Sequence, residues 1–179
     1  MKKNIFLVLI LVVAVLFFFF KGELKRTYLL RNSGVYGLDT KELIIALENN
    51  LLEDILVASI DDEFIVYYIQ EERYVHKLEV DLHYISFAPY IGLTHECYIH
   101  SLTGCQGELL MEDVYIEIYD ESGEKIFSDT LNTGEDGFIG LFLESNKVYN
   151  VKVESSGYSS EFQIDGYSKQ TCYTEVKLR

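Results

Sequence analysis

Two histidines and two of the three cysteines of this chain lie within eleven residues of one another. They are His95, Cys97, His100 and Cys105, in a chain of 179 residues with only four histidines. Thiolates and imidazoles are soft and borderline ligands that bind copper and zinc. The density of these side chains in one segment therefore indicates metal chemistry or thiol chemistry.

The third cysteine, Cys172, lies near the C-terminus in a segment with the alternation of a β-strand. Cys172 shares one face of this segment with Val176 and Leu178, so we expect its side chain to point with the core. A buried free thiol is common in cores. A thiol at the core edge that faced Cys97 and Cys105 would instead complete a three-thiolate site. The sequence alone does not bring these segments together.

The ligand types leave two interpretations of the cysteines open. One is a Cys97–Cys105 disulfide with Cys172 left over, since three cysteines form one bridge and one free thiol. The other is a site for Cu(I), which accepts two or three soft ligands, with neighbouring imidazoles. A structural zinc site normally has four ligands at paired short spacings, which this chain lacks, so zinc is only a substitute metal. We expect His76 and His83, which have no cysteine nearby, to be structural.

Composition and motifs exclude several function classes. The net charge of -14 argues against nucleic-acid binding, which needs clustered lysine and arginine. The sequence has no Gly-x-Ser-x-Gly, no phosphate-binding loop and no dinucleotide fingerprint. A nucleophilic pair of Cys97 and His100 is the weak exception. A metal-binding protein is therefore favoured over an enzyme.

The N-terminus has the pattern of an uncleaved signal anchor. Lys2 and Lys3 precede an apolar run from Ile5 to Phe20, and Lys21 ends it. This run is slightly shorter than the roughly 20 residues of a spanning helix and has no signal-peptidase site after it. We expect a transmembrane helix over residues 1–21, a stalk over residues 22–34, and an exported remainder.

The rest of the chain is expected to be α+β and mainly β. Asp39 and Glu42 form a capping-box pattern that begins a helix, which ends near Asn49 or runs on to Glu53. We expect a small α+β domain over residues 35–88, built from this helix and from strands at 55–60, 64–69, 74–80 and 82–88. This domain would pack on its neighbour or on a second copy, as a homodimer. We expect a β-sandwich over residues 89–179, because this part of the chain has the patterns of short strands at 114–119, 126–131, 138–143, 148–154, 161–164 and 172–178. Its turn and strand motifs resemble transthyretin-like sandwiches.

The segment from Phe87 to Leu109, which contains Cys97 and Cys105, resembles the signature of the CueP family of periplasmic copper-resistance and copper-binding proteins. Thr171-Cys172 and the segment from Asp136 to Gly140 are similar to the same family. The resemblance implies a protein that sequesters Cu(I) through Cys97, Cys105 and Cys172, with His95 and His100 as the nearby histidines. It also implies thiol redox chemistry and transfer of copper to a superoxide dismutase.

The hypothesis that follows is a membrane-anchored, extracytoplasmic protein at the cell surface or in the periplasm. It holds Cu(I) at the three cysteines, with His95 and His100 as auxiliary or entry ligands, and buffers or delivers copper. The alternative is a thiol redox protein that reduces Cu(II) or Fe(III) and ends as a Cys97–Cys105 disulfide. A third hypothesis is a surface interaction module with only a structural disulfide.

Overall fold

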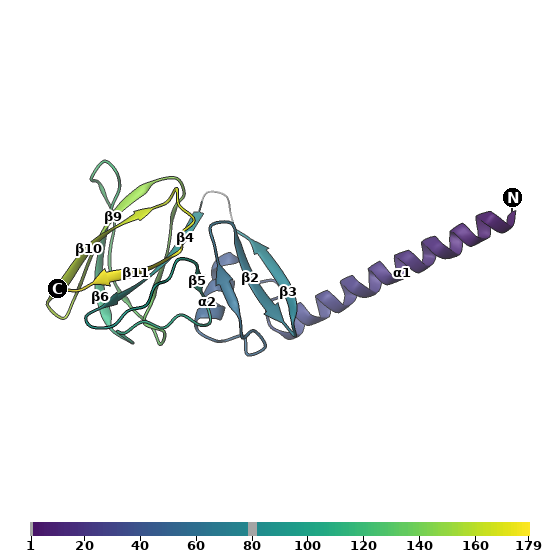
Figure 1. Ribbon diagram of the computed structural model, residues 1–179, viewed down its shortest axis with the longest axis horizontal. Helices are drawn as coiled ribbons and strands as arrows, with labels where there is room; N and C mark the ends of the chain where they lie inside the picture. The colour runs from purple at the N-terminus through teal and green to yellow at the C-terminus, as the bar shows by residue number, and fades with distance from the viewer. Residues whose placement is uncertain (1, 79–81) are drawn as a thin grey trace.

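Two β-rich units follow a long N-terminal helix in the computed structural model, which describes residues 2–78 and 82–179 (Figure 1). The first unit contains a short helix and one sheet. The second unit contains two sheets that share a core. The chain is thus mostly β with two helices among its described residues, as the sequence predicts.

The first unit packs the helix α2 (Thr40–Glu48) on a four-stranded sheet. Asp39 caps α2 in the predicted capping box: its side chain accepts from the backbone of Glu42, and the Glu42 side chain accepts from the backbone of Asp39. The apolar face of α2 (Leu43, Ile44, Leu47) is buried in the core. The sheet has the order β3-β2-β1-β5, with strands β1 (Ala58–Ile60), β2 (Phe64–Ile69), β3 (Glu72–Lys77) and β5 (His100–Ser101).

The second unit consists of two sheets, with the orders β10-β9-β6-β7 and β11-β4-β8. Both sheets contribute to one hydrophobic core, to which β6 supplies Ile116, β9 supplies Val151 and β4 supplies Phe87. The strands are β4 (Leu82–Tyr90), β6 (Asp113–Tyr119), β7 (Lys125–Asn132), β8 (Ile139–Glu144), β9 (Val148–Ser155), β10 (Tyr158–Asp165) and β11 (Cys172–Lys177).

Strand β4 differs from its prediction in place and in length. The sequence places residues 82–88 in the small α+β unit, whereas β4 pairs with β8 and β11 of the second unit. It also continues through Pro89 to Tyr90. Proline lacks an N–H and is tolerated at irregular pairings, and the register of β11 against β4 shifts just before Pro89. The expected strand end at 79–80 lies outside the described residues.

Helix α1 (Lys2–Asn32) continues without a break through most of the expected stalk. Its C-terminal end rests on the first unit, because Leu29 is buried in that core and the Arg26 guanidinium lies 5.1 Å from the ring centroid of Tyr74. Among the helices of residues 2–78 and 82–179, none is both long enough and apolar enough to cross a membrane. The membrane anchor expected at residues 1–21 is thus not confirmed.

Two glycines bring the segment after Cys105 against the loop before β8. The backbone N–H of Gly107 donates to the carbonyl of Asp136 at 2.6 Å. An added Cβ at Gly107 would overlap the backbone of Gly137, and an added Cβ at Gly137 would overlap Gly107. This close approach orders the chain on the C-terminal side of the cysteine segment.

The variant Gly107→Ala is expected to lower the free energy of unfolding by about 1–3 kcal/mol, because the new methyl group overlaps backbone that cannot move aside. Urea unfolding measures the change. Gly22→Ala is the matched control, since its Cβ meets nothing within 4 Å. Equal stabilities of the two variants would contradict the predicted overlap.

Candidate metal centre

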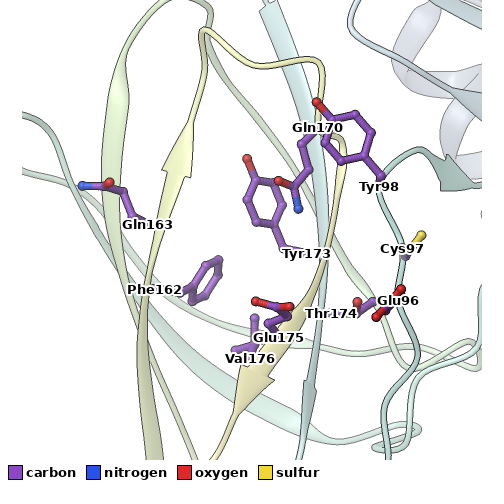
Figure 2. Close-up of a pocket in the computed structure, with 10 residues that line it drawn as sticks. All are labelled: Glu96, Cys97, Tyr98, Phe162, Gln163, Gln170, Tyr173, Thr174, Glu175 and Val176. Atoms are coloured by element: carbon purple, nitrogen blue, oxygen red, sulfur yellow. The ribbon is translucent and has the colours of Figure 1, made fainter.

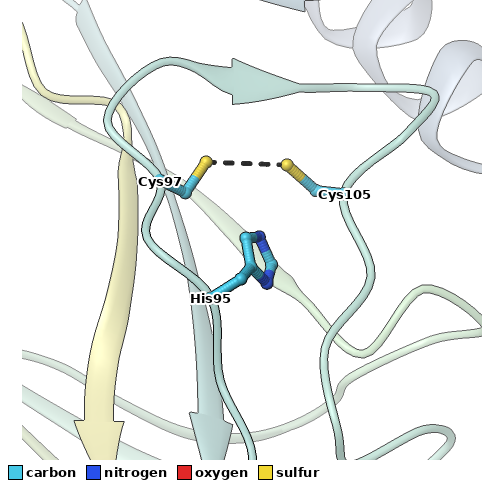
Figure 3. Close-up of side chains that lie close together, drawn as sticks. All are labelled: His95, Cys97 and Cys105. Atoms are coloured by element: carbon cyan, nitrogen blue, oxygen red, sulfur yellow. Dashed lines mark hydrogen bonds between the residues drawn. The ribbon is translucent and has the colours of Figure 1, made fainter.

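The three cysteine sulfurs come together at the junction of the two units. Cys97 lies in the loop before β5, Cys105 follows β5, and Cys172 begins β11. The Cys97 and Cys105 sulfurs lie 3.6 Å apart and face each other, with His95 beside them (Figure 3). Ala88, Phe138 and Cys172 form a small buried cluster against which Cys97 and Cys105 pack.

The disulfide of this structure joins Cys97 to Cys172, and Cys105 is the free thiol. The pairing of Cys97 with Cys105, expected in the redox alternative, is therefore wrong for this structure. Cys97 and Cys172 are 75 residues apart in sequence, so short spacing favoured the other pair. Their proximity arises because the Tyr98 carbonyl accepts from the backbone N–H groups of Thr171 and Cys172, at 2.9 and 3.2 Å.

Thr171 connects the cysteine segments through both its backbone and its side chain. Its hydroxyl donates to the Ile60 carbonyl at 2.7 Å and accepts from the His100 N–H at 3.0 Å. Its carbonyl accepts from the N–H of Ser86 at 2.8 Å. Because Thr171 is fully buried, these bonds form without competition from water, and they hold Cys172 beside the start of β5.

His100 is fully buried between the cysteines and the end of α2. It pairs with Ile60 of β1, and its ring packs 5.0 Å from the ring of Phe138. Neither ring nitrogen makes a hydrogen bond of ordinary geometry, and the nearest carboxylate oxygen, Glu48 Oε1, lies 3.5 Å from Nε2. Burial lowers the pKa of His100, but the adjacent Cys105 and Glu48 outweigh it and raise that pKa to about 9. His100 is therefore a buried cation at neutral pH.

Cys105 is placed to carry the matching negative charge. Its burial raises the pKa of the thiol, but the neighbouring His100 and the backbone N–H of Ser101, 3.4 Å from the sulfur, lower the pKa below its ordinary value. The charged forms of the Cys105 thiol and the His100 ring therefore favour each other. Cys105 is thus the most nucleophilic of the described sulfurs while the other two are bonded to each other.

Two overlapping groups of side chains bring potential ligand atoms within 4.8 Å of one another. One contains His95, Cys97 and Cys105, and the other contains His100, Cys105 and Cys172. Cys105 belongs to both, so all five residues singled out in the sequence surround one small volume. His95 is exposed and His100 is buried, so the cluster has a solvent side and a core side.

The other histidines lie outside both groups. A ring nitrogen of His76 lies 2.9 Å from the Thr40 hydroxyl, and one of His83 lies 3.2 Å from the Gln170 carbonyl. These bonds agree with the structural role expected for both.

A cavity of about 480 Å³ lies beside Cys97, between β10, β11 and the segment that precedes β5. Its lining includes Phe162, Tyr173 and Val176, whereas the Cys97 sulfur points away from them (Figure 2). Cys97 is the only one of the five potential ligands among the described residues that line this cavity. The cavity is therefore distinct from the candidate metal centre.

The sequence did not indicate three residues that shape the site, namely Glu48, Tyr84 and Thr171. Glu48 ends helix α2 and resembles any surface acid in the sequence. Tyr84 is one of fourteen tyrosines, and its hydroxyl donates to Glu48. Only Thr171 had a local signal, since it directly precedes Cys172.

A β-rich protein with a cluster of thiols and imidazoles belongs to the class of metal-binding proteins with soft ligands. The chain matches the family described as "Periplasmic copper-binding protein CueP" over residues 42–177, and it belongs to this CueP family. The resemblance found in the cysteine segment is thus confirmed, and copper is the metal of the family.

The solved structure titled "Crystal Structure of S.CueP" is similar to most of this chain. The two share 30% sequence identity with a TM-score of 0.79, over 86% of this chain and 98% of the other. A comparison with curated proteins gave no match.

The variant Thr171→Val is expected to lower the free energy of unfolding by about 1–3 kcal/mol, because it leaves the buried His100 N–H and Ile60 carbonyl without a partner. Chemical denaturation measures this loss. Thr130→Val, at an exposed position of β7, is the control and should be near neutral. A loss no larger than in the control would show that the Thr171 hydroxyl is dispensable.

Alkylation of the protein with its disulfide intact should modify Cys105 and should begin at a lower pH than for an ordinary thiol, whose pKa is about 8.5. In His100→Gln the midpoint of the rate against pH should move upward, because the cation that lowers the Cys105 pKa is gone. Mass spectrometry locates the modified residue. His76→Gln is the control, and a profile that His100→Gln left unchanged would contradict the ion pair.

Proposed function

We propose that this protein, in its reduced state, binds Cu(I) through Cys97, Cys105 and Cys172. The observation that carries the proposal is the convergence of three sulfurs from segments far apart in sequence, with Cys105 common to both potential ligand groups. Three thiolates form a soft site of the kind that Cu(I) prefers over harder metals. Zinc, which also accepts thiolate and imidazole, is the expected substitute.

Reduction of the Cys97–Cys172 disulfide must come before binding of this kind. Two electrons and two protons from an external dithiol convert the disulfide into two thiols. Cys105 then has two further sulfurs as neighbours. The oxidised protein offers Cu(I) only the Cys105 thiolate and the imidazoles, so its affinity should be much lower.

His95 and His100 act as auxiliary ligands on opposite sides of the sulfurs. His95 is exposed and suits the entry of copper, while His100 closes the buried side. Because His100 and the thiols lose protons when they bind a metal, copper binding should release protons and weaken as the pH falls.

The partly exposed side of the cluster also suits release of copper to another protein. Cys97 and Cys105 are half-buried and His95 is exposed, so an incoming ligand can reach the metal without unfolding the core. We propose that the protein buffers copper outside the cytoplasm and passes it to a recipient metalloprotein, such as the superoxide dismutase that the family resemblance implies.

Competition for Cu(I) with a chromogenic chelator under anaerobic conditions tests the proposal. Reduced wild-type protein should bind one equivalent, and each of Cys97→Ser, Cys105→Ser and Cys172→Ser should weaken binding by more than about tenfold, since each removes a direct ligand. His76→Gln should bind as the wild type does. Failure of the fully reduced wild type to compete for Cu(I) would refute the proposed site.

A thiol redox function is the second candidate, and the disulfide beside a third thiol favours it. In this scheme the thiols of Cys97 and Cys172 lose two protons and two electrons as their disulfide forms, and the electrons reduce two Cu(II) ions to Cu(I). Stoichiometric Cu(II) reduction by a protein that then releases all of its Cu(I) would favour this function over sequestration.

A further inference from the structure

Glu48 reaches the copper site from helix α2, which lies far from the cysteines in the sequence. It is the last residue of α2, and its carboxylate oxygen Oε1 lies 3.5 Å from Nε2 of His100. The same oxygen accepts a hydrogen bond from the hydroxyl of Tyr84. The Glu48 side chain is only 20% exposed to solvent, and the His100 side chain is fully buried.

The position of Glu48 is unfavourable for a carboxylate unless a specific partner stabilises it. The C-terminus of a helix carries partial negative charge from its free carbonyl groups, so an acid there is repelled. The last turn of α2 has no basic residue. His100 is the buried cationic group beside it, and the Tyr84 hydroxyl donates a hydrogen bond to its carboxylate.

The surrounding chain is shaped to keep this contact. Asn49 is the C-cap of α2, so the helix ends directly after Glu48. The backbone N–H of Asn49 donates to the carbonyls of Ile45 and Leu47. On the other side, the Tyr84 hydroxyl occupies the space where a side chain at residue 140 would begin, and residue 140 is glycine. Both features fix where the carboxylate lies relative to His100.

His100 itself shows why a positioning group is needed. It is fully buried, and neither of its ring nitrogens makes a hydrogen bond of ordinary geometry. Histidines that bind metals normally have a carboxylate, a carbonyl or a water on their second nitrogen, which orients the ring and raises its basicity. Glu48 is the only carboxylate within 4 Å of this ring among the described residues.

We propose that Glu48 is the positioning residue of the copper site, which orients the His100 ring against the three sulfurs and is itself oriented by Tyr84. This inference deepens the proposed Cu(I) function and, for its effect on affinity, rests on it. It makes helix α2 part of the site, since this helix supplies a group that acts on copper through His100.

The variant Glu48→Gln, which keeps the shape and removes the charge, tests the proposal in the full-length reduced protein. Cu(I) affinity should fall by about 10–100-fold, the usual effect of losing a partner of a metal-binding histidine. In the reduced protein without metal, the ring ¹⁵N and ¹³C resonances of His100 should shift. Tyr84→Phe should change both readouts in the same direction and by less.

Glu53→Gln is the matched control, because it makes the same change at an exposed position five residues further along the chain. It should alter neither the His100 resonances nor the affinity. Thermal unfolding of each variant identifies any general loss of structure. If Glu48→Gln lowers stability, Tyr84→Phe, which keeps the carboxylate, supplies the decisive comparison.

The proposal is overturned if Glu48→Gln and Tyr84→Phe match Glu53→Gln in both the His100 resonances and the Cu(I) affinity. A purely structural role would change the melting temperature and leave the ring resonances unchanged, and this outcome also overturns the proposal.

The Glu48 proposal and the copper-site proposal can fail separately. A wild type that does not bind Cu(I) refutes the copper site, while the His100 resonances of the metal-free variants still decide whether Glu48 orients the ring.

Discussion

The buried hydrogen bonds of Thr171 are the constraint on which the rest of the site depends. Through them one residue contacts β1, β4 and β5. Cys172 follows it directly, so its sulfur meets the loop that carries Cys97. Buried polar groups without partners are costly, and this chain satisfies them here by bringing its two units together at the cysteines.

Charge is organised around the same junction. The chain carries a net charge of -14, yet the fully buried His100 of this site has a pKa raised to about 9. His100 keeps its proton because Cys105 and Glu48 approach it from two sides. Charges in a site of low dielectric interact strongly, so the charged forms of Cys105 and His100 favour each other.

Local patterns predicted the local structure well and the pairing of distant segments poorly. Asp39 and Glu42 identified the start of α2, and alternation identified β2 and most strands of the second unit. Strand β4 was assigned to the wrong unit, because its partners β8 and β11 come much later in the chain. The disulfide considered as one alternative joined Cys97 to Cys105 rather than to Cys172 for the same reason, since sequence distance is a weak guide to contacts made across sheets.

The sequence by itself determined which atoms are available for chemistry: three thiols, two nearby imidazoles and a family signature that indicates copper. It could do so because ligand chemistry is a property of side-chain type and short spacing. Only the tertiary structure decided that Cys172 joins Cys97, that Cys105 stays free beside His100, and that Glu48 approaches the site from the end of α2. Those contacts depend on sheet order and on the packing of two cores, which link residues too far apart in the chain for any local pattern to relate them.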